Sequence, residues 1–253
     1  MTYCLGMLLD AGLVMIADTR TNAGVDNFSC YQKLREVSAG SDKQIFIASS
    51  GNLSMSQAVV GLLEEGLPEA EGSDVPRTLD AAKSMFRVAQ LIGEAVQVAT
   101  RSVGEALAEI NLNGSVSLLV GGRIGNTRPR LFLIYSAGNF IECQREAPFF
   151  QIGETKYGRP ILDRAVSLDM PIAEAVKIGF LSFDSAMRSN LAVARPLDVM
   201  IMPADIDIPV LTRRIERDDV YFNDLSASWS RLLREATKAI PQPPFLLNLA
   251  GPG

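Results

Sequence analysis

The amino-acid sequence predicts an α+β protein whose fold is a four-layer α/β/β/α sandwich, with two antiparallel sheets packed face to face and flanked by helices. Neighbouring apolar runs are separated by short turns that contain glycine, which is typical of antiparallel hairpins. The predicted helices come in pairs, and these pairs alternate with the hairpins along the chain. We therefore expect the 253 residues to form a single domain, with a C-terminal helix and tail over about residues 223–253.

The first hairpin is predicted at the start of the chain. Apolar runs at residues 3–9 and 13–17 flank Asp10-Ala11-Gly12, and Asp and Gly tolerate the backbone angles of tight turns. Residues 19–32 are polar and rich in Gly and Asn, which favours a loop. Residues 33–51 then predict a strand, a glycine-containing turn and a second strand.

Helices and strands alternate through the rest of the chain. Polar starts, apolar residues at helical spacing and closing glycines indicate the helices, which we expect at about residues 52–65, 78–110, 157–166, 171–189 and 223–239. Apolar runs between Gly- and Asn-rich turns indicate a strand within residues 111–125, a hairpin within residues 128–144 and a strand at residues 197–202.

The composition narrows the possible chemistry. A net charge of −5 gives no electrostatic support for a nucleic-acid partner. The chain has no histidine, which excludes Ser-His-Asp and Cys-His catalysis, imidazole bases and histidine-ligated metals. Cys4, Cys30 and Cys143 are too few and too scattered for a disulfide framework or a metal site, and they fit a reducing compartment. We therefore expect no metal and no cofactor.

The chain carries no targeting pattern. The first positive charge, Arg20, follows the first apolar runs, whereas a secretory leader carries its charge ahead of them. No apolar stretch approaches the length of a membrane span. We therefore expect no signal peptide, no membrane association and a cytoplasmic location.

The opening segments resemble a known family. Thr2, GLVMIADTRTNAG at residues 12–24, YQKLREV at residues 31–37 and IFIASSG at residues 45–51 are similar to the proteasome β-subunit family of N-terminal nucleophile hydrolases. The opening resembles in particular the bacterial branch of that family called Anbu, the ancestral β-subunit. The resemblance implies the N-terminal nucleophile hydrolase fold, a proteasome-type peptidase domain and a threonine nucleophile that becomes the first residue when Met1 is removed.

The resemblance also implies the catalytic residues. It makes Thr2 the nucleophile, with Asp18 and Lys33 as its partners, and it assigns Ser115 and Asp184 to the network around the amine of Thr2. The family has a serine where Met187 stands, and the sequence leaves open whether Ser185 or Ser189 replaces it.

The implied substrate contacts lie in the same segments. They are Arg20, Asn22, Ile47, Ser49, Ser50 and Gly51. In the family's pattern, Asn22 matches a contact with the substrate main chain, Ile47 the floor of the specificity pocket, and the backbone N–H of Ser49 the donor that faces the oxyanion.

The residue types suit this chemistry on physical grounds. A threonine hydroxyl is a weak nucleophile and needs a base. The α-amine of Thr2 can serve, because a terminal amine has a pKa of roughly 7.7–8.0, close to working pH. A positive charge on Lys33 would favour the neutral amine and stabilise the alkoxide, and Asp18 would hold Lys33 in place. The first hairpin brings the end of its second strand, where Asp18 lies, back beside Thr2.

The sequence keeps several functions open. The first is a threonine peptidase that acts on a peptide within a homo-oligomer, either a ring or an open helical stack. The second is a non-proteolytic amidase or amidotransferase, because a fold does not determine its substrate. The third is an inactive structural subunit. The wide apolar arc of the helical segment at residues 78–110 predicts contacts with neighbouring subunits, whereas the substrate, the number of subunits and any ATPase partner are undetermined.

Overall fold

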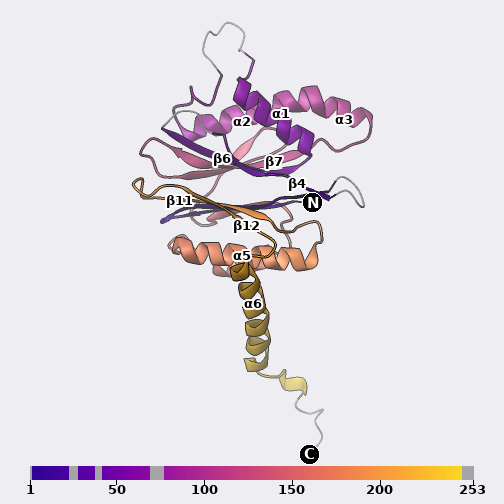
Figure 1. Ribbon diagram of the computed structural model, residues 1–253, viewed down its shortest axis with the longest axis vertical. Coiled ribbons are helices and arrows are strands. Elements are labelled where there is room, and N and C mark those ends of the chain that lie inside the picture. Colours follow the sequence, from indigo (N-terminus) through magenta and orange to yellow (C-terminus); the bar gives the residue numbers. More distant parts are fainter. Residues whose placement is uncertain (1, 23–27, 38–41, 69–76, 247–253) are drawn as a thin grey trace, which may run out of the picture. The chain divides into compact units, whose positions relative to one another are not determined.

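The computed structural model describes residues 2–22, 28–37, 42–68 and 77–246 (Figure 1). The chain divides into two compact units, Met1–Arg217 and Asp218–Gly253. We describe each unit by itself, and the expectation of a single domain stays a prediction.

One sheet of the larger unit contains the predicted first hairpin. Its strand order is β10-β1-β2-β11-β12, and all neighbouring strands are antiparallel. The strands are β1 (Tyr3–Leu9), β2 (Gly12–Asp18), β10 (Phe149–Gly153), β11 (Leu197–Pro203) and β12 (Leu211–Ile215). The residues of β1 and β2 are buried almost without alternation, as expected for central strands that are covered on both faces. The sequence pattern did not predict the two edge strands, β10 and β12.

The second sheet is also antiparallel, with the order β5-β6-β7-β8-β9. The strands are β5 (Leu34–Glu36), β6 (Lys43–Gly51), β7 (Val116–Ile124), β8 (Arg130–Ile134) and β9 (Phe140–Glu142). Two further strands, β3 (Arg20–Asn22) and β4 (Phe28–Cys30), pair with each other. They correct the prediction of an unbroken loop over residues 19–32.

Helices cover the outer faces of the two sheets. Figure 1 shows α1 (Leu53–Glu65), α2 (Met85–Ala99) and α3 (Glu105–Glu109) over the sheet that contains β6 and β7. A π-helical turn, Thr100–Gly104, joins α2 to α3. On the other sheet, α5 (Ile172–Ser189) packs against β1 and β2, and α4 (Arg159–Ala165) packs against α5. This arrangement confirms the predicted four-layer sandwich.

The helix boundaries follow the capping residues. Asn52 caps α1, because its side-chain oxygen accepts from the N–H groups of Ser54 and Met55. Ser84 caps α2 through a hydrogen bond from the N–H of Arg87. The helix predicted from residue 78 therefore begins only at Met85. The smaller unit contains α6 (Val220–Ala239) and a short 3₁₀ helix, Pro244–Leu246.

Two clusters of buried apolar residues in the larger unit involve the second sheet. One lies between the two sheets and includes Met15 and Met200 from one sheet and Leu119 and Leu131 from the other. The other lies between the second sheet and α1 and α2. Together they hold the ends of β1, β2 and β6 at fixed positions. None of the described helices is both long and apolar enough to cross a bilayer.

Candidate active site

The first residues of the chain are held from two sides, because β1 lies between β2 and β10. The backbone N–H of Tyr3 donates to Oδ1 of Asp18 at 2.8 Å. The carbonyl of Thr2 accepts from the backbone N–H of Glu154 at 2.6 Å. The peptide unit between Thr2 and Tyr3 is therefore fixed in position and orientation, and Thr2 itself is half-buried.

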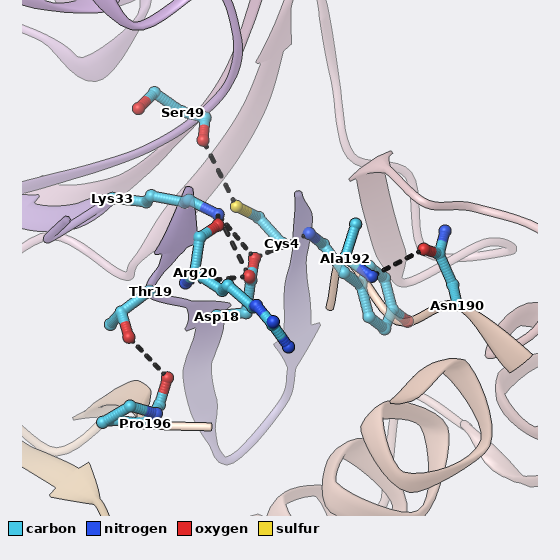
Figure 2. Close-up of polar contacts among 10 residues, drawn as sticks. Cys4, Asp18, Thr19, Arg20, Lys33, Ser49, Asn190, Ala192 and Pro196 are labelled. Atoms are coloured by element: carbon cyan, nitrogen blue, oxygen red, sulfur yellow. Dashed lines mark hydrogen bonds and ion pairs between the residues drawn. The ribbon is translucent and has the colours of Figure 1, made fainter. Parts of the chain in front are cut away.

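A buried ion pair lies beside this segment. The ammonium of Lys33 contacts Oδ1 and Oδ2 of Asp18 at 2.9 and 3.0 Å, and both residues point toward each other in Figure 2. Asp18 is 0% exposed and Lys33 is 6% exposed. The backbone N–H of Arg20 adds a hydrogen bond to Oδ2 at 3.1 Å, and the carbonyl of Arg20 accepts from the Lys33 ammonium. The structure thus joins Asp18, Lys33 and the backbone of Arg20 in one cluster next to Thr2.

Burial dominates the electrostatics of this cluster. It raises the pKa of the Asp18 carboxyl, while Lys33 and the N–H groups of Tyr3 and Arg20 act in the opposite direction. Cys4 is fully buried beside the pair, and burial also raises the pKa of its thiol. The thiol donates to the carbonyl of Ser49 at 3.6 Å (Figure 2), which suits a neutral thiol in the core.

The end of β6 forms the edge of the site. The N–H of Ser49 donates to the carbonyl of Lys33 at 3.1 Å, so the donor expected to face the oxyanion is already engaged. Successive N–H groups of a strand point to alternate sides, so the N–H of Gly51, two residues after Ser49, points to the same side as that of Ser49, the side of Lys33. At this position β6 has already passed the first residue of β5. Gly51 has a φ of +112°, and a Cβ there would lie 2.3 Å from the carbonyl oxygen of Ser115. The hydroxyl of Ser50 lies close to Gly153.

For two residues of the expected amine network, the structure describes contacts with residues other than Thr2. Ser115 is exposed, and its described hydrogen bonds join it to Asn113 and Asn52 rather than to Thr2. Asp184 is buried on α5 and accepts from Nε of Arg188 at 3.0 Å. Ser185 is partly buried and Ser189 is exposed, whereas Ser182 is fully buried and shares a hydrogen bond of 2.6 Å with the hydroxyl of Tyr3.

Glu154 is the site residue that the sequence analysis missed. It is 5% exposed and follows directly after β10, so its backbone reaches Thr2. Its carboxylate accepts from the N–H of Lys156 at 3.0 Å and from Nδ2 of Asn190 at 2.6 Å. Asn190 caps the C-terminus of α5, and it therefore links that helix to the start of the chain. The only sequence signal is a carboxylate directly after a glycine at the end of an apolar run, which is weak.

The side chain of Tyr3 anchors the start of β1 to α5 and β10. Its ring stacks on Phe183 with a centroid distance of 4.3 Å, and its hydroxyl also accepts from Nε2 of Gln151 at 2.6 Å. Burial raises the pKa of the Tyr3 phenol to about 12. Tyr3 is therefore a neutral structural residue at ordinary pH.

The remaining predicted contacts are described in part. Ile47 is buried and lines a small pocket together with Lys33 and Ser49. The backbone of Asn22 ends β3, but its side chain lies outside what the structure describes.

The chain is similar to known proteins over nearly its whole length. The family model described as proteasome subunit matches residues 2–202. The Anbu (Gly-1) mutant from Hyphomicrobium sp. strain MC1 is 43% identical with a TM-score of 0.85, over 96% of this chain and 99% of that chain. Anbu from Yersinia bercovieri is 37% identical with a TM-score of 0.82, over 96% and 99% of the two chains.

A third solved structure is the helical assembly of the Anbu complex from Pseudomonas aeruginosa. It is 36% identical with a TM-score of 0.83, over 96% of this chain and 98% of that chain. No curated protein sequence matches the chain significantly. The fold, the family model and these relatives agree, and the chain therefore belongs to the proteasome subunit family, in its Anbu or ancestral β-subunit branch.

Proposed function

We propose that the protein is an N-terminal threonine hydrolase, a proteasome-type peptidase in which Thr2 is the nucleophile after Met1 is removed. The observation that carries this proposal is the buried Asp18–Lys33 ion pair, because Asp18 also binds the N–H that follows Thr2. A buried charge pair is costly to desolvate, and its placement at the start of the chain favours a catalytic use.

The reaction follows from these positions. The free α-amine of Thr2 takes the proton of the Thr2 hydroxyl as its oxygen attacks the amide carbonyl. The protonated amine then passes this proton to the leaving amine, and the acyl group remains on the Thr2 oxygen as an ester. Water, activated by the same amine, hydrolyses the ester and restores the hydroxyl. The Lys33 ammonium stabilises the negative charge that develops on the Thr2 oxygen.

Two further groups support this chemistry. The N–H of Gly51 lies on the Lys33 side of β6, and we assign it the oxyanion contact in place of the engaged N–H of Ser49. Glu154, whose N–H holds the Thr2 carbonyl and whose carboxylate is held by Asn190, is a positioning residue for the nucleophile. Ser115 and Asp184 stay predicted members of the network around the Thr2 amine.

The test compares variants of the nucleophile. The mass of the intact purified protein shows whether Met1 is absent, and cleavage of a fluorogenic peptide library gives the activity. Thr2→Ala is expected to abolish turnover and Thr2→Ser to keep part of it, because serine supplies the same hydroxyl. Wild-type rates in Thr2→Ala would rule out the assignment. Cleavage of simple amides without cleavage of any peptide would favour the non-proteolytic amidase.

We also propose that the chain works as a homo-oligomer. A relative from Pseudomonas aeruginosa forms a helical assembly, which supports an open stack more than a closed ring. Within the described residues, Phe86 on α2 and Ile110 after α3 are exposed, at 48% and 64%. Static light scattering at micromolar concentration is expected to give a mass well above the 27.4 kDa of the chain, and a stable monomer would contradict this proposal.

A further inference from the structure

A cleft of about 480 Å³ opens between the edges of the two sheets. Its lining comes from β5 and β6 of the second sheet and from β11 and β12 of the sheet that contains the first hairpin, and β5 and β12 are edge strands. Small-molecule sites in proteins commonly have volumes of roughly 300–1,000 Å³. The described lining includes none of Thr2, Asp18 and Lys33, and the cleft is therefore distinct from the candidate active site.

The inner part of the cleft is apolar. Leu34 on β5, Phe46 on β6 and Met200 on β11 line it, and all three belong to the apolar cluster between the two sheets. Cross-strand partners lie on the same face of a sheet, so Thr212, the partner of Met200, faces the same space as Met200. The three apolar side chains are buried, whereas Thr212 is exposed. A ligand in the cleft therefore meets apolar groups at its inner end and polar groups nearer the surface.

The outer part of the cleft carries an excess of positive charge. Its described lining contains three guanidinium groups and two carboxylates, which are those of Arg35, Arg213, Arg214, Glu36 and Asp198. Asp198 accepts from Nε and Nη2 of Arg214 at 2.7 and 3.0 Å, so these two charges compensate each other. Two cations and one carboxylate remain, and the described lining has one positive charge in excess.

Two of the guanidinium groups retain donors for a ligand. Arg35 donates to the backbone carbonyl of Gln32 at 3.1 Å, and among the described residues no carboxylate forms an ion pair with Arg35. Arg213 is exposed, and no described residue binds its guanidinium. A guanidinium has five N–H donors in a planar fork that matches the two oxygens of a carboxylate. Arg35 and Arg213 therefore offer both charge and hydrogen bonds from opposite edges of the cleft.

We propose that this cleft binds a small organic anion that carries an apolar group. Its carboxylate accepts hydrogen bonds from Arg35 and Arg213, and its apolar group packs against Leu34 and Phe46. The single excess positive charge matches a monocarboxylate better than a polyanion. Two sources supply this chemistry, the carboxyl end of a peptide with an apolar last residue and a fatty acid. The site lies outside the proposed hydrolase mechanism and does not depend on it.

Calorimetric titration of the full-length protein is the first test. N-acetylleucine and octanoate carry a carboxylate on an apolar group, and N-acetylleucinamide and octanamide are their neutral counterparts. Each acid is expected to bind about tenfold more tightly than its amide, as for one charge-assisted hydrogen bond. Acetate, which lacks the apolar group, should bind more weakly than octanoate. Equal affinity of acid and amide, acetate binding as tight as that of octanoate, or no binding of any probe would overturn the inference.

Substitution of Arg213 is the second test. Arg213 lines the cleft alone, whereas Arg35 also lines the small pocket beside Lys33. Arg213→Gln should weaken the binding of both acids about tenfold and leave the amides unchanged. Arg164→Gln, which removes an exposed arginine of α4 outside the cleft, should have no effect. If Arg213 serves only to keep the edge of β12 from pairing with other strands, Arg213→Gln leaves the affinities unchanged and the inference fails.

The two acids distinguish the sources of the ligand. Tighter binding of N-acetylleucine assigns the cleft to the carboxyl ends of peptides, and tighter binding of octanoate assigns it to fatty acids. Either result supports the site, provided that Arg213→Gln removes the preference for the acid. The readout is binding rather than turnover, so the outcome stands whether or not Thr2 proves to be the nucleophile.

Discussion

The backbone N–H of Glu154 donates to the carbonyl of Thr2 at 2.6 Å, and this hydrogen bond ties the residue after β10 to the start of β1. Glu154 is buried, and Asn190 at the end of α5 binds its carboxylate. A change at Glu154 therefore acts on Thr2 through the backbone, and a substitution that removes only its charge tests whether the carboxylate acts on Thr2 as well.

Glu154→Gln is expected to preserve the fold and to change the pH dependence of activity. An anion near the protonated α-amine raises its pKa, so removing the charge should move the acidic limb of the kcat/KM profile to lower pH, by about one unit or less. Asp163→Asn, an exposed carboxylate on α4 paired with Arg159, is the control and should leave the limb in place. An unmoved limb in Glu154→Gln would show that Glu154 acts only through its backbone.

Single changes in the ion pair are expected to cost both stability and activity. Asp18→Asn or Lys33→Ala leaves one buried charge without its partner, and the free energy of unfolding in urea should fall by about 3–5 kcal/mol. Peptide hydrolysis should fall at least about 100-fold in both variants, because each one removes or displaces the Lys33 charge.

The double variant Asp18→Asn, Lys33→Met separates the two effects. It leaves no unpaired charge, so much of the stability should return while the activity stays low. Activity that returns together with stability would show that the pair is structural.

Gly153→Ala is expected to disturb the nucleophile. Gly153 has a φ of +83°, and a Cβ there would lie 2.0 Å from the carbonyl oxygen of Thr2. The variant should lose about 1–2 kcal/mol of stability from the left-handed backbone and most of its activity, because Thr2 must move. Gly61→Ala in α1 is the control, because no atom lies within 4 Å of its Cβ position and helix propensity should add about 0.5–1 kcal/mol. Wild-type kinetics in Gly153→Ala would show that the Thr2 carbonyl does not pack closely against residue 153.

Stability is expected to fall at alkaline pH because of Tyr3. The pKa of its phenol is 10.0 in an unfolded chain and about 12 in the folded protein, so the unfolded state loses this proton first. The free energy of unfolding should therefore decrease as pH rises from 10.0 toward 12, by up to about 3 kcal/mol. Urea unfolding at a series of pH values in wild type and Tyr3→Phe isolates the effect. Identical slopes in the two proteins would show that Tyr3 does not cause it.

Local patterns were sufficient for most elements of the fold. The hairpin of β1 and β2 has a strong apolar pattern and a short Asp-Ala-Gly connection. Asn52 and Gly66 cap the two ends of α1. The missed strands have weaker signals. Four of the five residues of β12 are exposed, and β3 and β4 are short and partly polar, so their pairing with neighbours defines them more than their own composition.

The residues of the candidate site also differ in how well the sequence predicts them. Asp18 and Lys33 could be predicted beside Thr2, because the hairpin and the next strand bring together residues that are close along the chain. Glu154 reaches Thr2 because β10 pairs with β1, and Asn190 reaches Glu154 because α5 packs on that sheet. Whether the N–H of Ser49 or of Gly51 is free depends on which N–H of β6 bonds the carbonyl of Lys33. The residue types of the site can therefore be predicted from the sequence. Long-range strand pairing and strand register determine which groups contact the nucleophile, and no short segment encodes them.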